Sequence, residues 1–343
     1  MSQCRGRLAP SPTGALHLGN ARSFLLAWLS IRSRGGSLVL RMEDLDHPKV
    51  KSGAAAQALE DLRWLGLDWD EGPDIGGPYA PYVQSQRLPL YAAALEKLRT
   101  QGLVYPCVCS RRDVESAQGA PHAEDEGAPY PGTCRGRFSS FEEAAATLPA
   151  GRLPAWRFRA PDERVVFHDR FAGEVAANVA QRDGDFVLAR HAGGAGYMLA
   201  VVVDDACMGI TDVLRGDDLL PATHRQILLY RALGLPIPQF THVPLVVSTD
   251  GRRLAKRHGD TRIATRRAQG MPPERVVGLL AHWCGWAAAD AVVTPRELLS
   301  QIDWAKLPKT PVVMHYETLT DDDGVFPRSL VAIVQRRAQD DCN

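Results

Sequence analysis

The stretch Arg7-Leu-Ala-Pro-Ser-Pro-Thr-Gly-Ala-Leu-His17-Leu-Gly19-Asn20 decides the fold of this chain. A short extended run leads into it, and a segment whose apolar residues recur at helical spacing follows it, with a turn rich in proline and glycine between them. Where a strand turns tightly into a helix, free backbone N–H groups and the positive end of the helix dipole favour phosphate. His17 and Asn20 can donate hydrogen bonds there, and Gly19 allows a close approach to the backbone. The stretch predicts a triphosphate site; a histidine that only caps the helix is the alternative.

Strands and helices alternate around this turn. The predicted strands span 5–9, 37–41 and 242–247, and the predicted helices span 16–34, 53–65 and 219–233. Such alternation predicts an α/β fold built on a parallel, Rossmann-type nucleotide-binding sheet. From about residue 102 the chain is rich in cysteine, proline, glycine and charged residues, and a short alanine-rich helix is predicted at 141–147. We interpret this segment as an insertion.

Five segments follow from the pattern. Residues 1–101 and 193–247 are expected to form the two halves of the catalytic domain, and residues 102–192 are expected to form the insertion. Residues 248–312 are expected to hold a basic loop and a helical subdomain. The role of the tail, 313–343, stays open, although a helix is predicted at 329–339.

Composition and charge narrow the class of protein. With 343 residues, of which 45% are hydrophobic and 23% charged, the chain can bury a large core and fits about two domains. Forty basic residues balance forty acidic ones, so any contact with RNA must be local. No apolar run approaches the roughly twenty residues of a membrane span, and the N-terminus has no hydrophobic leader. We expect a cytoplasmic monomer that does not associate with membranes.

Two further clusters combine acidic, basic and aromatic side chains. The string RMEDLD at 41–46 follows a predicted strand, at the edge where ligands bind to open α/β sheets. The string YMLAVVVDD at 197–205 precedes RGDD at 215–218, and the step of eighteen residues places Tyr197 and Arg215 on neighbouring elements of one crevice. Taken singly, these strings are typical of a solvated loop, a core aromatic and a surface charge.

A basic loop follows the last predicted strand. The string TDGRRLAKRHG at 249–259 contains a lysine, Lys256, that could stabilise a negatively charged leaving group by electrostatic positioning. The alternative is a solvated basic hairpin, because such runs of charge are common.

The predicted insertion contains three cysteines that could hold a metal ion. Cys107-Val-Cys109 and Tyr130-Pro-Gly-Thr-Cys134 place three thiols and a phenol within about thirty residues, enough for a closed four-ligand zinc site. Seven cysteines is an odd number, which favours thiols and a metal over a disulfide framework. His122 competes with Tyr130 as the fourth ligand, and unliganded thiols remain an alternative.

In their order along roughly residues 5 to 310, these motifs resemble those of the class I aminoacyl-tRNA synthetases. His17-Leu-Gly-Asn20 resembles the HIGH signature of that class, and the preceding R-x-A-P-S-P-T-G is characteristic of the glutamyl/glutaminyl branch. The string at 249–259 resembles the KMSKS loop, with Ala255 in place of the usual serine. The resemblance implies a class I catalytic domain with a zinc-containing insertion and a helical C-terminal subdomain.

The resemblance also implies roles for individual residues. Those implied to bind L-glutamate are Arg7, Ala9, Ser11, Glu43, Tyr197 and Arg215, and those implied to bind ATP, with Mg²⁺, are His17, Gly19, Asn20 and Lys256. Glu43 would hold the α-ammonium group of the substrate, and Arg7 and Arg215 would bind its two carboxylates as bidentate forks. Which arginine takes which carboxylate stays open. His17, Asn20 and Lys256 would be the catalytic residues.

The cysteine pattern narrows the resemblance to one group within the branch. C-x-C followed by Y-x-x-x-C is the pattern of the glutamyl-Q tRNA(Asp) synthetases, and it implies Cys107, Cys109, Tyr130 and Cys134 as ligands of one structural zinc ion. We expect no anticodon-binding region, because only a few dozen residues follow the catalytic motifs. This resemblance implies activation of glutamate with ATP without tRNA, then transfer of glutamate to the queuosine base in the anticodon of tRNA(Asp).

Three other functions remain as alternatives. The chain could be a truncated glutamyl-tRNA synthetase that charges the 3′ end of tRNA(Glu), a non-catalytic RNA-binding paralogue, or an unrelated nucleotidyltransferase that shares the turn at His17. A truncated glutamyl-tRNA synthetase and a glutamyl-Q synthetase differ in the tRNA that accepts glutamate, so this tRNA distinguishes the two functions. The paired pocket residues Tyr197 and Arg215 argue against the last.

We predict that Lys256→Ala reduces glutamate activation much more than it weakens glutamate binding. The lysine is expected to act on the departing pyrophosphate, which carries its full charge only as the reaction proceeds. Steady-state kinetics of ATP–pyrophosphate exchange, compared with a glutamate-binding measurement, checks this. An equal loss of both would mean that the role of the loop is misassigned.

Overall fold

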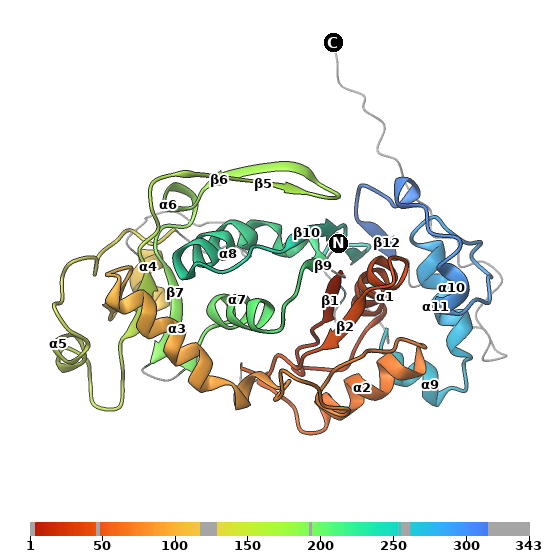
Figure 1. Cartoon of the computed structure of the whole chain (residues 1–343), viewed down its shortest axis with the longest axis horizontal. Helices are drawn as coiled ribbons and strands as arrows, with labels where there is room; N and C mark the ends of the chain where they lie inside the picture. Colours follow the sequence, from red (N-terminus) through yellow and green to blue (C-terminus); the bar gives the residue numbers. More distant parts are fainter. Residues whose placement is uncertain are drawn as a thin grey trace, which may run out of the picture.

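Two pairs of parallel strands lie side by side and carry the opening motif. In the computed structural model, which describes residues 4–45, 49–116, 129–191, 194–252, 254 and 261–314, β1 (Arg5–Leu8) pairs with β2 (Ser37–Leu40), and β9 (Asp212–Gly216) pairs with β10 (Gln239–Val243). The backbone N–H of Thr211 donates to Arg5 O at 2.9 Å, which sets β9 beside β1. The strands therefore follow the order β2, β1, β9, β10 (Figure 1).

Helices connect and cover these strands. They are α1 (Leu18–Arg32), α2 (Ala54–Trp64), α3 (Leu88–Thr100), α7 (Tyr197–Cys207) and α8 (Leu220–Leu233). α1 packs on β1 and β9 and buries Trp28 together with its leucines in the larger core. α3, α7 and α8 pack against one another around a second core, next to β10 (Figure 1). The alternation of strand and helix that the sequence predicts is therefore observed.

Between α3 and α7 the chain forms mostly antiparallel structure. A sheet of four strands runs in the order β3 (Val104–Cys107), β4 (Ala155–Phe158), β7 (Phe186–His191) and β8 (Gly194–Ala195). A separate hairpin, β5 (Arg164–Asp169) and β6 (Gly173–Asn178), lies along α8 and reaches β10 (Figure 1). The short helices of this part are α4 (Arg111–Ser116), α5 (Phe141–Ala146) and α6 (Val179–Arg182).

The part that follows β10 is mainly helical and packs against α1. Its elements are β11 (Val246–Ser248), α9 (Ile263–Ala268), α10 (Pro273–His282), α11 (Pro295–Leu298) and β12 (Val312–Met314). Single 3₁₀ turns are η2 (Gln84–Gln86), η3 (Asp217–Leu219) and η5 (Trp304–Lys306). β12 returns to pair in parallel with β11, a pairing that the sequence did not predict. Within the described ranges, no helix is both long and apolar enough to cross a bilayer.

The structure confirms most of the predicted elements and corrects one. The helices predicted at 16–34, 53–65, 141–147 and 219–233 are present with slightly shorter bounds, and the apolar run from Tyr197 forms α7. The single strand predicted at 242–247 is wrong. Pro244 has no N–H to continue the ladder, so the chain leaves β9 there and pairs with β12 from Val246 onward. The helix predicted at 329–339 lies outside the described residues.

Candidate functional site

A large cleft opens where β1 and β9 end and α1 begins. It has a volume of about 1030 Å³, and its walls come from the loop after β1, the first turn of α1, the ends of β2 and β9, and the start of α7. Eight of the ten residues implied to bind substrate line it, namely Arg7, Ala9, Ser11, His17, Asn20, Glu43, Tyr197 and Arg215. Gly19 lies in the first turn of α1. Lys256 lies outside the described residues.

His17 caps α1. Its Nδ1 accepts a hydrogen bond from the backbone N–H of Asn20 at 3.2 Å, and Asn20 Oδ1 accepts one from the backbone N–H of His17 at 3.5 Å. Because Nδ1 is an acceptor, the neutral ring carries its proton on Nε2. A β-carbon at position 19 would lie 3.1 Å from the His17 ring, so close packing at the turn favours Gly19. The capping role is observed, and the role in phosphate binding stays a prediction.

Described residues on both sides of the segment 255–260 lie beside this helix start. The backbone N–H of Leu18 donates to Thr261 O at 3.0 Å, and the backbone N–H of Ile263 donates to Leu16 O at 2.9 Å. Leu254, which precedes the segment, is buried and packs beside Gly19. The segment itself, with Lys256, lies outside the described residues.

Arg41 is fully buried among three carboxylates. Its Nη1 donates to Asp205 at 2.7 Å and its Nη2 donates to Glu43 at 2.9 Å, while its Nε lies 3.7 Å from Asp204. Asp204 and Asp205 had no predicted role, although two adjacent acids that end an apolar run were a signal that they face a buried partner. The cluster joins the end of β2 to α7.

Further side chains fix Asp204 within this cluster. Arg87 Nε donates to its Oδ1 at 2.7 Å, and Gln84 and Tyr91 donate to its Oδ2 at 2.9 and 2.8 Å. Asp204 is completely buried, so these bonds replace the water that its charge loses. The sequence did not single out Gln84, Arg87 or Tyr91, because each of the three lies more than a hundred residues from Asp204.

Glu43 faces the cleft from the end of β2. Its backbone N–H donates to Pro10 O at 3.0 Å, which ties it to the loop of the opening motif. Burial raises the pKa of Glu43, while the charges of Arg41 and Arg7 act in the opposite direction. A further cation in the cleft would favour the ionised carboxylate, so the position suits an ammonium group.

Arg215 is buried, and its hydrogen-bond partners among the described residues are all uncharged groups. Its Nε donates to His242 Nε2 at 2.9 Å, its Nη2 donates to Thr223 Oγ1 at 2.8 Å and to Gln226 Oε1 at 2.7 Å, and its Nη1 makes a longer contact of 3.4 Å with the Tyr197 hydroxyl. No carboxylate of the described residues forms an ion pair with it. A buried guanidinium without an acidic partner favours an anionic ligand.

The contacts of Arg215 change the expected mode of binding. A bidentate fork would use two neighbouring nitrogens, but Nε and Nη2 already donate to protein groups. Nη1 is the nitrogen left for a ligand in the cleft. Fewer donor groups of Arg7 are occupied by protein contacts: its Nη1 donates to Leu214 O at 3.3 Å, and its Nε only approaches Asp205, at 3.6 Å.

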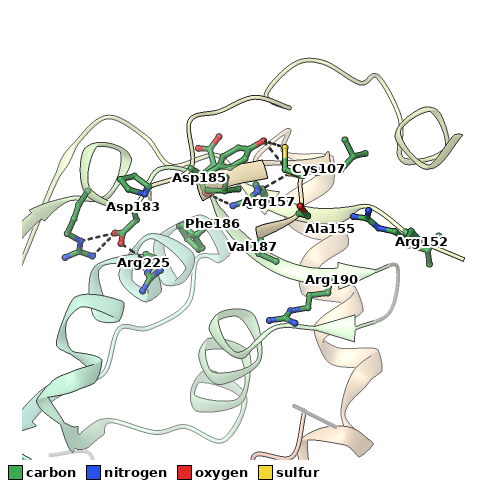
Figure 2. A pocket seen from close by; sticks show the side chains of 18 residues that line it. Cys107, Arg152, Ala155, Arg157, Asp183, Asp185, Phe186, Val187, Arg190 and Arg225 are labelled. Atoms are coloured by element: carbon green, nitrogen blue, oxygen red, sulfur yellow. Dashed lines mark hydrogen bonds and ion pairs between the residues drawn. The ribbon is translucent and has the colours of Figure 1, made fainter. Parts of the chain in front are cut away.

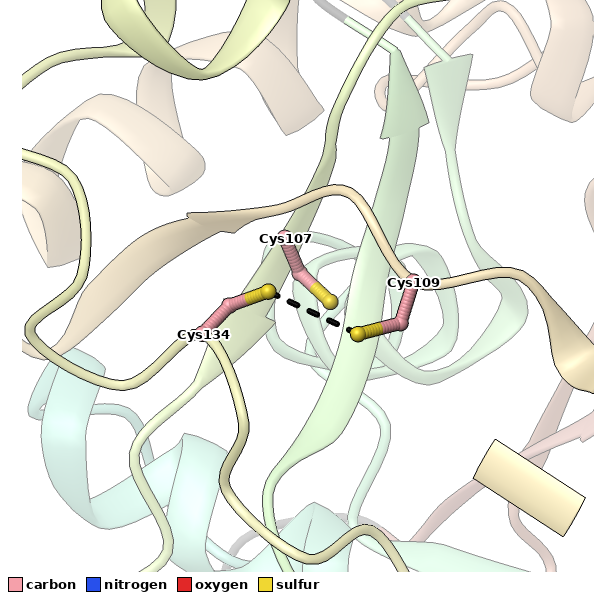
Figure 3. Close-up of side chains that lie close together, drawn as sticks. All are labelled: Cys107, Cys109 and Cys134. Atoms are coloured by element: carbon pink, nitrogen blue, oxygen red, sulfur yellow. Dashed lines mark hydrogen bonds between the residues drawn. The ribbon is translucent and has the colours of Figure 1, made fainter. Parts of the chain in front are cut away.

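Cys107, Cys109 and Cys134 converge between β3 and the loop that follows Tyr130. Their sulfur atoms lie within 4.8 Å of one another (Figure 3). Ligands of a tetrahedral zinc ion with Zn–S bonds of about 2.3 Å would lie roughly 3.8 Å apart. The Tyr130 hydroxyl lies 3.4 Å from Cys107 Sγ and 3.7 Å from Cys109 Sγ. This donor set is compatible with a four-ligand metal site; the competing ligand His122 lies outside the described residues.

Arg157 touches this cluster from the wall of a second cavity, of about 670 Å³ (Figure 2). Its Nε donates to Cys107 Sγ at 3.2 Å, and its guanidinium lies 3.7 Å above the Tyr130 ring. Its Nη1 donates to Asp185 O at 2.8 Å, which fixes the side chain. A fixed cation beside Cys107 would offset the negative charge of metal-bound thiolates, which supports the metal interpretation. No local pattern indicated Arg157, because it lies 50 residues from Cys107.

Comparisons with known proteins agree on one family. The family model of the catalytic domain of class I tRNA synthetases (E and Q) matches residues 3–321. The glutamyl-Q tRNA(Asp) synthetase of Symbiobacterium thermophilum is 52% identical over 320 residues, which cover 93% of this chain and 98% of that relative. The glutamate–tRNA ligase of Dehalococcoides mccartyi is 40% identical over 334 residues, which cover 96% of this chain and 66% of the ligase.

A solved structure gives the same result. The crystal structure of a glutamate tRNA ligase from Elizabethkingia meningosepticum in complex with its amino acid matches this chain with a TM-score of 0.76 at 30% identity. The match covers 91% of this chain and 67% of that one.

We predict that the purified chain carries about one zinc ion, as expected for a closed site of three thiolates and a fourth ligand. Cys109→Ser should lower the zinc content well below that of the unaltered protein, because it removes one of three sulfur ligands. Cys207→Ser is the matched control, since Cys207 is an exposed free thiol outside the cluster. Elemental analysis after dialysis against a weak chelator checks this. Equal zinc contents in the two variants, or no zinc in the unaltered protein, would contradict the assignment.

Proposed function

We propose a function from the family of this chain, which belongs to the class I tRNA synthetases specific for glutamate and glutamine and to the glutamyl-Q group among them. In this proposal the chain activates glutamate with ATP and transfers it to the queuosine base in the anticodon of tRNA(Asp). The observation that carries the proposal is that one cleft contains both Arg215, a buried guanidinium that forms no ion pair with the described acids, and Glu43, a largely buried carboxyl group.

The charges of the cleft match those of glutamate. Glu43 suits the α-ammonium group, and Arg7 and the Nη1 group of Arg215 suit the two carboxylates. Burial raises the pKa of Tyr197, so its phenol keeps its proton and can donate to a carboxylate oxygen. Ala9 and Ser11 lie on the loop between these groups and the start of α1. We assign these six residues to the amino-acid part of the cleft.

The other end of the cleft suits ATP. The first turn of α1 offers backbone N–H groups and the positive end of the helix dipole to the phosphates, and His17 and Asn20 lie at its start. Leu254 and Thr261, which flank the segment of Lys256, lie beside this turn, and on that basis we assign Lys256 to the pyrophosphate. Mg²⁺ would accompany the nucleotide as part of the substrate.

The proposed reaction has two steps. A carboxylate oxygen of glutamate attacks the α-phosphorus of ATP in line, the bond to the bridging oxygen breaks, and pyrophosphate leaves. His17, Asn20 and Lys256 stabilise the charge that develops on the phosphates, and the remaining pocket residues hold the two reactants together. A hydroxyl group of the queuosine base then attacks the carbonyl carbon of the glutamyl-adenylate, and AMP leaves.

We also propose the finer architecture that the family resemblance implies. The strands β2, β1, β9 and β10 with their helices would form a Rossmann-type nucleotide-binding domain, divided by an insertion at 102–192 and followed by a helical subdomain at 248–312. A structural zinc ion held by Cys107, Cys109, Tyr130 and Cys134 would brace the insertion and take no part in the chemical steps.

One relative supports a second candidate. The Dehalococcoides mccartyi ligase shares 40% identity, and charging of tRNA(Glu) by this chain is therefore the alternative. The sequence identity favours the first proposal, because this chain is 52% identical to the Symbiobacterium thermophilum relative and 40% identical to the ligase.

We predict that radiolabelled glutamate is transferred to tRNA(Asp) that contains queuosine. Queuosine-free tRNA(Asp) is the matched control, because it differs only in the base that offers the acceptor hydroxyl, and it should stay unlabelled. Acid-precipitable label on purified tRNAs measures the transfer. Labelling of tRNA(Glu) in place of tRNA(Asp) would establish the ligase alternative.

A further inference from the structure

Two buried residues outside the motifs, His242 and Asp169, fix the side chain of Arg215. Its Nε donates to His242 Nε2 at 2.9 Å, and His242 Nδ1 lies 2.7 Å from Asp169 Oδ2. Asp169 and His242 are 0% and 1% exposed, and Arg215 is 6% exposed. The three side chains come from three elements: Asp169 ends β5, His242 lies on β10, and Arg215 lies on β9.

Asp169 is fixed as a carboxylate. Its Oδ1 accepts the backbone N–H groups of Phe171 and Ala172, each at 2.9 Å, and that of His242 at 3.1 Å. Burial alone raises the pKa of Asp169, but the hydrogen bonds from the His242 ring and these backbone groups outweigh it and bring the pKa down to about 2. Oδ2 is therefore a permanent acceptor that faces the imidazole.

The hydrogen-bond pattern leaves one arrangement for the proton of His242. Arg215 Nε always carries a hydrogen, so His242 Nε2 must accept it and the ring proton must lie on Nδ1, where Asp169 accepts it. Burial lowers the pKa of His242, which favours the neutral ring that this arrangement needs. Thr223 Oγ1 accepts from Arg215 Nη2, and it can give its own proton either to Leu219 O, 3.2 Å away, or to His242 Nε2, 3.1 Å away; both fit an Nε2 that carries no proton.

We propose that Asp169 and His242 are positioning residues for Arg215: Asp169 selects the imidazole form whose Nε2 holds Arg215 Nε, so that Nη1 is aimed at a carboxylate in the cleft. The inference rests on the proposed binding of glutamate and deepens it. The β5–β6 hairpin thereby contributes to the amino-acid site through Asp169, although it packs on β10 and supplies none of the described residues that line the cleft.

A purely structural role is the competing explanation. The same end of the hairpin is also tied to the sheet by Arg170, whose Nη1 donates to Asp212 Oδ1 at 2.6 Å and whose backbone N–H donates to Phe240 O at 3.0 Å. If Asp169 only docked the hairpin, loosening either tie would have similar effects. Within the described contacts, Asp169 is connected to Arg215 through His242, whereas Arg170 contacts Asp212 and Phe240. Variants at Asp169 and Arg170 therefore distinguish a positioning role from a purely structural one.

Asp169→Asn is the sharpest test. Its amide oxygen can keep the three backbone N–H bonds at Oδ1, while its NH₂ group replaces the acceptor that faces His242 Nδ1. The ring would then have to accept at Nδ1 and carry its proton on Nε2, which meets the N–H of Arg215 as donor against donor. We expect the KM for glutamate in ATP–pyrophosphate exchange to rise by roughly tenfold or more, as for other positioning partners of a binding group. The KM for ATP should change little.

The control is Arg170→Gln, which removes the partly exposed ion pair with Asp212 at the same end of the hairpin. It should leave the KM for glutamate within about twofold, because a partly exposed pair contributes little. NMR of protein labelled with ¹⁵N-histidine reports which ring nitrogen of His242 carries the proton: Nδ1 in the unaltered protein and Nε2 in Asp169→Asn are the expected results.

Three results would overturn the proposal: a proton on Nε2 in the unaltered protein, an unchanged KM for glutamate in Asp169→Asn, or equal rises in both KM values that Arg170→Gln reproduces. If Asp169→Asn fails to fold, His242→Gln takes its place, since it removes the imidazole and leaves Asp169 with its bonds to Phe171 and Ala172; an unchanged KM for glutamate there would equally overturn it. If the unaltered protein shows no glutamate-dependent exchange, the proposed function fails, and the NMR measurement still decides the arrangement of the three side chains.

Discussion

The candidate site depends on the burial of one cation, Arg41, among acids from different parts of the chain. Arg41 has no exposed surface, and it bridges Glu43 at the end of β2 with Asp204 and Asp205 on α7. Removing one member of such a cluster leaves an uncompensated buried charge, at a cost of roughly 3–5 kcal/mol. The cluster therefore fixes the end of β2 relative to α7, and these two elements form walls of the cleft. The ion pair with Arg41 also fixes the side chain of Glu43.

The two arginines that face the cleft differ in how the protein holds them. Arg7 approaches Asp205, which Arg41 already engages more closely, whereas the contacts of Arg215 within the described part of the chain are all to neutral groups. The cleft thus places two arginines, Arg7 and Arg215, near the carboxylate of Glu43, and Asp218 and Arg262 line it as well. Glutamate, with two carboxylates and one ammonium group, complements this distribution, and this complementarity is the physical basis of the proposed function.

The sequence predicted the residues of the cleft better than it predicted what supports them. The residues from Arg7 to Asn20 form one continuous string, and Tyr197 and Arg215 also lie in recognisable strings, so their meeting in one cleft followed from local patterns. The supporting contacts did not follow. Asp169 and His242 are 73 residues apart, and no local pattern relates two positions that only the docking of a hairpin brings together. The same holds for Arg157 beside Cys107.

The contacts of Arg215 favour binding of a carboxylate through Nη1 over the expected bidentate fork, and the sequence did not indicate this for a similar reason. A residue type and its place in a motif indicate which group is present, but the contacts made by its other nitrogens decide how much of that group is available. The strand predicted at 242–247 was wrong because an apolar run does not reveal that its two halves pair with different neighbours. His122 and Lys256 lie outside the described residues, so their predicted roles stay predictions.

Binding of ATP and glutamate together in this cleft is tested most sharply by ATP–pyrophosphate exchange in the absence of any RNA. We expect exchange that depends on glutamate and is far weaker with aspartate or glutamine, because neither matches both the spacing and the charge of the second carboxylate. Exchange that requires tRNA, or that does not distinguish glutamate from these two amino acids, would contradict it.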